Sequence, residues 1–101
     1  MANKLFVRID KGSGKPIVLL HGMFADGSQW ESIAELLSKN YRVIVVDLFG
    51  HGRSPRPKNA KYTVTEHVNA LHKTLLSLKA DKDITMVGYS MGGAVALAYG
   101  S

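Results

Sequence analysis

The chain has 101 residues, 46% of them hydrophobic and 21% charged, with a net charge of +5 and no cysteine. This length allows one domain with a modest core, and the composition is that of a globular rather than a disordered chain. The lack of cysteine excludes disulfides, thiolate catalysis and cysteine metal sites, and it fits a reducing compartment.

No apolar stretch approaches the ~20 residues that cross a bilayer. The N-terminal residues do not read as a signal peptide, because Arg8 and Asp10 interrupt their apolar run. We therefore expect a cytoplasmic protein without membrane contact. The basic residues are scattered, and the looser basic group at 53–61 has little aromatic company besides Tyr62. We interpret that group as a solvated loop rather than a nucleic-acid site.

The first half of the chain predicts two strands and a helix. Residues 5–9 alternate as a strand, 11–16 carry turn residues, and 17–20 form a continuous apolar run typical of a buried strand. A helix is expected over 28–38, where Ser28 and Glu31 fit a capping box. Its apolar positions recur at helical spacing, and they are Trp30, Ile33, Ala34 and Leu37.

The second half repeats this alternation. Residues 42–47 are a second buried strand rich in valine, and 48–61 are a long loop with glycine and proline. Thr63 and Glu66 fit another capping box. The helix behind that box has one apolar stripe, made of Val64, Val68, Leu71, Leu75 and Leu78. A third buried strand is expected over 83–87 and a last helix over 91–99.

This order of elements predicts an α/β fold, with a mostly parallel four-stranded sheet and helices on both faces. We expect the first strand to be antiparallel, since a short turn cannot make a parallel crossover. Sites in such sheets form outside the carboxyl ends of the strands. Three loops leave those ends here, over residues 21–27, over 47–54, and at the pentapeptide Gly88-Tyr89-Ser90-Met91-Gly92.

The pentapeptide is a G-x-S-x-G motif between a strand and a helix, which is the context of a nucleophile elbow. There a strained turn exposes a serine at the N-terminus of a helix, whose partial positive charge favours a nearby oxyanion. Gly88 and Gly92 would keep side chains from colliding across the turn, and Gly93 would let the helix approach the sheet. The alternative for Ser90 is a plain helix N-cap.

With all three loops in this order, the chain resembles the α/β-hydrolase family, closest to its small esterase-like and carbon–carbon-hydrolase-like members. The matching segments are His21-Gly22-Met23-Phe24, Asp47-Leu48-Phe49-Gly50-His51-Gly52-Arg53-Ser54 and Gly88-Tyr89-Ser90-Met91-Gly92-Gly93. The resemblance implies hydrolysis of an ester or related acyl transfer on a small molecule, with Ser90 as the nucleophile. The backbone N–H groups of Met23 and Met91 would form the oxyanion hole. No cofactor or metal is implied.

Other residues near these motifs have two interpretations. His21 is a candidate base, but we favour a structural histidine that braces the oxyanion loop beside Gly22. Asp47 and His51 are expected to tie down their own loop, with Arg53 as a structural cation there. Phe24 and Tyr89 are candidate substrate contacts, while the side chains of Met23, Phe24 and Met91 either line an acyl pocket or fill core. His67 and His72 are expected to be surface histidines, because their spacing of five makes a poor metal pair.

A serine nucleophile needs a base and an orienting acid, which in this fold follow the serine in the chain. After Ser90 the sequence has neither an acid nor a histidine. We therefore expect residues 1–101 to be a single incomplete domain, the N-terminal part of a hydrolase ending in the helix after the elbow, with little or no activity alone. Two alternatives stay open: a non-catalytic α/β scaffold or minimal folding fragment, and a lyase or thioesterase on the same fold. The edge strand 83–87 is expected to mediate self-association.

Overall fold

The computed structural model describes residues 4–22, 26–48, 63–89 and 91–100. Four strands form one sheet in the order β1-β3-β2-β4, and these are β1 (Phe6–Lys11), β2 (Pro16–Leu20), β3 (Arg42–Asp47) and β4 (Thr85–Gly88). β2, β3 and β4 are mutually parallel, whereas β1 pairs antiparallel with β3. The mostly parallel sheet and the reversed first strand are therefore confirmed.

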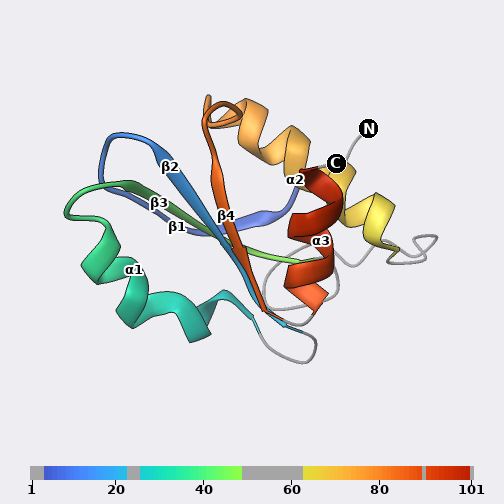
Figure 1. Ribbon diagram of the computed structural model, residues 1–101, viewed down its shortest axis with the longest axis horizontal. Coiled ribbons are helices and arrows are strands. Elements are labelled where there is room, and N and C mark those ends of the chain that lie inside the picture. Colours follow the sequence, from blue (N-terminus) through green and yellow to red (C-terminus); the bar gives the residue numbers. More distant parts are fainter. Residues whose placement is uncertain (1–3, 23–25, 49–62, 90, 101) are drawn as a thin grey trace.

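Helices cover both faces of this sheet (Figure 1). The short 3-10 helix η1 (Gly27–Trp30) and α1 (Glu31–Leu37) lie on one face, and α2 (Val64–Ser77) and α3 (Met91–Tyr99) lie together on the other. Because side chains alternate along a strand, β2 and β3 supply both cores. Val18, Leu20, Ile44 and Val46 face α2 and α3, while Ile17, Leu19, Val43 and Val45 face α1.

The helix expected over 28–38 begins differently in the structure. Asp26, not Ser28, caps the segment, and its carboxylate accepts the Ser28 N–H at 2.8 Å. The first turn is then the 3-10 helix η1, and the α-helix starts only at Glu31. The expected capping box at Ser28 is therefore wrong, because an acceptor two residues earlier takes its place. Of the expected apolar stripe, Ala34 is buried but Ile33 is 45% exposed.

Helix α2 has the expected capping box, with both Thr63–Glu66 hydrogen bonds formed. The expectation that His67 lies on the surface is wrong, because its side chain is only 1% exposed. His67 precedes the buried Leu71 and Leu75 at intervals of four, which places all three on the same helical face. His72 is exposed, as expected, and its Nδ1 lies 2.9 Å from the Tyr99 hydroxyl.

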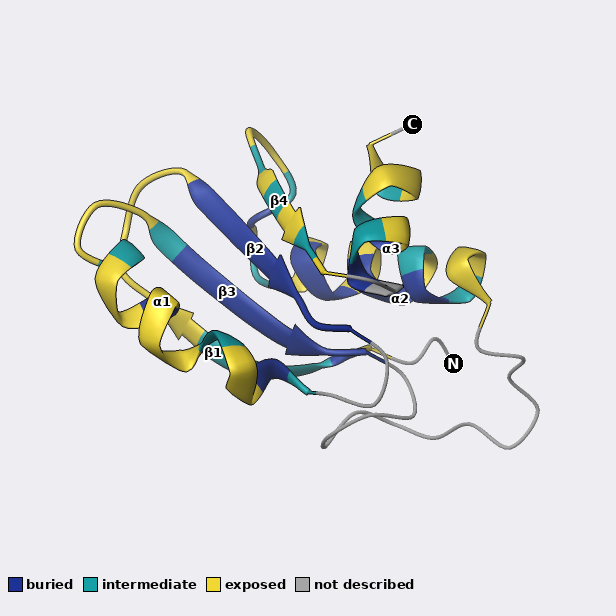
Figure 2. Cartoon of the chain, turned by 60° about the horizontal axis from the view of Figure 1, so that its bottom comes forward, coloured by how far each residue is buried: buried dark blue, intermediate teal, exposed yellow. Residues whose placement is uncertain are grey.

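The expectation that the last strand is buried on both faces is wrong. β4 starts at Thr85, after Asp83 adopts a left-handed backbone with φ of 56°, and exposed residues alternate along it. Figure 2 shows the contrast with β2, which is buried throughout, and with β3, which is buried after its first residue. Within the described sheet β4 pairs with β2 alone, so one of its edges is open. None of the described helices is long and apolar enough to cross a membrane.

Candidate active site

The carboxyl ends of β2 and β4 lie side by side, and the chain leaves them toward opposite faces of the sheet. After β2 it runs to η1 and α1, and after β4 it enters α3 on the other face. Such a divergence is the topological switch point at which ligands bind in open α/β sheets. The loop after β2 and the G-x-S-x-G segment therefore meet where the fold favours a site.

A tight turn follows β4. The Tyr89 N–H donates to the Leu20 carbonyl at 3.1 Å, which extends the parallel pairing with β2 by one residue. The Gly92 N–H then donates to the Tyr89 carbonyl at 3.0 Å, so the chain reverses within a single turn and enters α3. Ser90 stands between these two residues in sequence, and its own placement lies outside the described residues.

Two glycines permit this close packing. A Cβ added to Gly88 would lie 2.2 Å from the Gly92 carbonyl oxygen. A Cβ added to Gly92 would lie 2.5 Å from the carbonyl oxygens of both Leu20 and His21. As expected, a side chain at Gly88 would collide with the opposite flank of the turn at Gly92. The close approach of helix to sheet, which we expected of Gly93, instead depends on Gly92, since a Cβ on Gly93 would meet nothing nearer than 3.4 Å.

His21 joins the loops that follow β2 and β3. Its side chain is fully buried, its Nε2 lies 2.8 Å from the Leu48 N–H, and its Nδ1 lies 2.7 Å from the Gly22 carbonyl. Because the Leu48 N–H is a donor, Nε2 must be the acceptor, and Nδ1 then carries the proton given to Gly22. Both ring nitrogens of the neutral imidazole are therefore engaged, which favours a bracing role over a general base.

Asp47, at the end of β3, is also fully buried and reaches beyond its own loop. Its carboxylate accepts two hydrogen bonds from Arg8, at 3.1 and 3.0 Å, and one from the Gly27 N–H at 2.7 Å. These bonds join Asp47 to β1 and η1, while the loop that Asp47 was expected to tie down lies, from residue 49 on, outside the described residues. The hydrogen bonds from Arg8 to Asp47 raise the pKa of the guanidinium, against the opposing effect of burial.

Asp26 is a further charged residue beside Arg8. It lies 3.5 Å from the Arg8 guanidinium, and hydrogen bonding by Ser28 lowers the pKa of its carboxyl. The Gly22 N–H donates to the Gln29 side chain at 3.3 Å. Arg8 and Gln29 are the residues that sequence reasoning missed, because neither belongs to a motif and each acts through a partner distant in sequence.

Several expected site residues lie outside the described residues, and these are Met23, Phe24, His51, Arg53 and Ser90. Met91 begins α3. The Tyr89 side chain is 64% exposed at the end of β4. No group of three or more potential metal ligands occurs among the residues that the structure describes.

Known proteins with similar sequences and structures identify the family of this chain. The family described as alpha/beta hydrolase fold matches residues 15–101. The chain is 33% identical over 92 residues to the 2-hydroxy-6-oxo-6-(2'-aminophenyl)hexa-2,4-dienoic acid hydrolase of Metapseudomonas resinovorans. Among solved structures, an esterase from a marine microorganism superimposes with a TM-score of 0.86 at 34% identity, and an esterase from Exiguobacterium antarcticum with 0.83 at 33%. The chain belongs to the α/β-hydrolase family.

These matches cover most of this chain but only part of each relative. The alignment takes in 88% of this chain and 31% of the dienoic acid hydrolase. For the two esterases the figures are 96% and 98% of this chain against 36% and 39% of theirs. The chain therefore spans about a third of the length of the relatives it matches.

Proposed function

We propose that this chain carries the nucleophile and the oxyanion hole of a serine hydrolase acting on carboxylic esters or on related acyl compounds. Ser90 Oγ bonds to the carbonyl carbon while its proton passes to a base. The tetrahedral intermediate then breaks the ester C–O bond, the alcohol leaves with that proton, and water later hydrolyses the acyl-serine that remains. The N–H groups of Met23 and Met91 hold the developing oxyanion. No cofactor or metal enters this chemistry.

The turn after β4 is the single observation that supports the proposal most. Gly88 lies so close to Gly92 that a Cβ added to it would be 2.2 Å from the Gly92 carbonyl oxygen. A Tyr89–Gly92 hydrogen bond joins the two flanks of Ser90, and α3 begins immediately after it. The first N–H groups of a helix have no intrahelical partners, so they are available to an anion at this point. Homologous esterases with the same fold make an ester the favoured substrate class.

Turnover by residues 1–101 alone is expected to be very low. No acid or histidine follows Ser90, and His21 is engaged at both ring nitrogens. Loss of triad members typically removes about 10⁴-fold or more of the rate, while an oxyanion hole retains a small part of it.

A fluorophosphonate probe separates this proposal from a purely structural scaffold. Peptide mass spectrometry after labelling is expected to find the phosphonyl group on Ser90 in preference to the other serines, and Ser90→Ala should lose it. The same preparation should show no ester turnover above that of Ser90→Ala. A folded chain with no preference for Ser90 would support the scaffold instead, and rapid turnover would refute the expected inactivity.

We also propose that β4 associates with a second copy of the chain through its open edge. β4 and the residue after it carry exposed apolar side chains, with Val87 42% and Tyr89 64% exposed. An unpaired apolar strand of this kind is a template for pairing, and antiparallel pairing of β4 with its own copy satisfies two-fold symmetry.

Sedimentation velocity tests this association. We expect the unmodified chain to form dimers or larger species, and Val87→Lys to shift the population toward monomer. Leu36→Lys is the matched control, because Leu36 is 66% exposed on α1, away from this edge. A clean monomer at high concentration for the unmodified chain would rule the edge out as an interface.

A further inference from the structure

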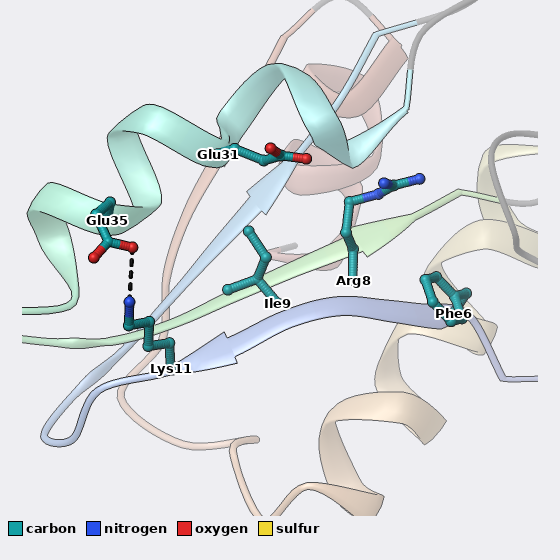
Figure 3. Close-up of a pocket in the computed structure, with 6 residues that line it drawn as sticks. All are labelled: Phe6, Arg8, Ile9, Lys11, Glu31 and Glu35. Atoms are coloured by element: carbon teal, nitrogen blue, oxygen red, sulfur yellow. Dashed lines mark hydrogen bonds and ion pairs between the residues drawn. The ribbon is translucent and has the colours of Figure 1, made fainter.

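Arg8 is the extra residue of a β-bulge in β1. The pairing passes from Val7↔Val46 to Ile9↔Val45, so Arg8 is skipped. In a regular strand Arg8 and Ile9 would point to opposite faces. Figure 3 shows both side chains reaching from β1 toward α1. Alternation from Phe6, which pairs with Asp47, already places Arg8 on the face on which Asp47 stands, and the bulge turns Ile9 to that face as well.

A continuous series of contacts runs from this bulge to the loop after β2. Arg8 holds both carboxylate oxygens of Asp47, and Asp47 Oδ1 also accepts the Gly27 N–H at 2.7 Å. Gly27 is the first residue of η1. Two residues later, the Gln29 side chain accepts the Gly22 N–H at 3.3 Å. Gly22 directly precedes Met23.

Gly27 is closely packed against its neighbours in this series. A Cβ added there would lie 2.6 Å from Val45 Cγ1, 3.0 Å from Arg8 Cδ and 3.0 Å from Asp47 Oδ1. The start of η1 therefore rests directly on the ion pair and on the sheet. Residues 23–25 are preceded by Gly22 and followed by Asp26 and Gly27. Gly22 and Gly27 are both held by the hydrogen bonds of this series.

We propose that the Arg8–Asp47 pair is a positioning device for the end of the described segment at Gly22, acting through η1. The inference rests on the proposed function, in which the N–H of the next residue, Met23, binds the oxyanion. Donors of this kind work only when they are fixed before the charge develops. The buried Asp47 carboxylate accepts two hydrogen bonds from Arg8 and one from Gly27, and such bonds fix direction as well as distance, which apolar packing at the same place would not do.

Amide hydrogen exchange followed by NMR tests the proposal in the full chain. Arg8→Lys keeps the charge but loses the two-pronged contact with Asp47. We expect the amides of Gly22 and Gly27 to lose about tenfold more protection than the Tyr89 amide, which is bonded to Leu20 across the site. Comparison with Tyr89 removes any loss due to global unfolding, which would affect all three amides alike.

Arg42→Lys is the matched control. Arg42 makes the same two-pronged contact with Asp10, at 2.9 and 2.8 Å, between the same two strands but away from the loop. Arg42→Lys should change the exchange protection of the three amides equally or not at all. An equal loss at Gly22, Gly27 and Tyr89 in Arg8→Lys would show that the pair adds only stability, and an unchanged Gly27 amide would also overturn the proposal.

Gln29→Ala provides a second variant, since Gln29 is exposed and its removal leaves Arg8 and Asp47 intact. It should speed exchange at Gly22 and leave Gly27 unchanged, and an unchanged Gly22 would overturn the transmission through η1. The phosphonate experiment separates the two proposals. Absence of labelling at Ser90 with the expected exchange pattern would refute the hydrolase function and retain the mechanical link, whereas labelling without that pattern would refute the link alone.

Discussion

Gly92→Ala is expected to lower the free energy of unfolding by about 3 kcal/mol, whereas Gly93→Ala should leave it unchanged or raise it slightly. The added methyl group in Gly92→Ala would lie 2.5 Å from two carbonyl oxygens of the backbone that leaves β2. No side-chain rotation relieves such a collision, so α3 must move away from the sheet. Urea denaturation of the two variants measures the difference directly.

Gly93→Ala is a stringent control because it adds the same methyl group one residue along the same helix. Its nearest neighbour, the Gly88 carbonyl oxygen, would be at 3.4 Å, which is an ordinary contact. Alanine is also favoured over glycine within a helix by about 0.5–1 kcal/mol. Equal destabilisation by both variants would contradict the packing described for the turn.

Arg8→Gln is expected to lower the free energy of unfolding by about 3 kcal/mol, and Arg42→Gln by less than about 1 kcal/mol. Both variants remove an arginine that contacts an aspartate between β1 and β3. The difference is burial, since the Asp47 side chain has no exposure while that of Asp10 is 29% exposed. Removing Arg8 takes two hydrogen bonds and a positive charge away from a carboxylate in the interior, whereas water can solvate Asp10.

Thermal and urea unfolding of the two variants test this ordering. Arg8→Lys should fall between Arg8→Gln and the unmodified chain, because it restores the charge without the paired hydrogen bonds. If Arg8→Gln and Arg42→Gln destabilised the chain equally, burial of Asp47 would not be the controlling factor.

The parts of the fold that the sequence predicts are those set by local patterns. The apolar runs at 17–20 and 43–46 predict the two central strands, because strands buried on both faces read as nearly continuous apolar runs. The Thr63–Glu66 box fixes the start of α2 because its hydrogen bonds are made within four residues. Gly88 and Gly92 are predictable because a tight strand-to-helix turn excludes side chains at its flanks.

The contacts missed from the sequence depend on residues brought together by tertiary structure. The alternation of residues 5–9 gives no sign of the bulge at Arg8, which turns Ile9 to the same face as Arg8. Asp47 and Gly27 are 20 residues apart and meet only because β3 lies beside the loop after β2. At the start of η1, Asp26 and Ser28 are both good caps, and the packing of Gly27 on the sheet favours the earlier one.

The two buried histidines illustrate the difference between features set by local sequence pattern and contacts made by tertiary structure. His67 lies four residues from Leu71, so its position on the buried face follows from helical geometry, although its polarity suggests the surface. His21 has a bracing role that follows from its place between two loops. Its tautomer depends on the Leu48 N–H, a backbone donor that no sequence pattern identifies.

The proposed function requires a nucleophile and an oxyanion hole that are already assembled in this chain. A crystal structure of the chain phosphonylated at Ser90 tests this requirement most directly. We predict that the phosphonyl oxygen lies about 2.7–3.1 Å from the backbone nitrogens of both Met23 and Met91. A phosphonyl oxygen directed to solvent, with neither amide within hydrogen-bond reach, would contradict it.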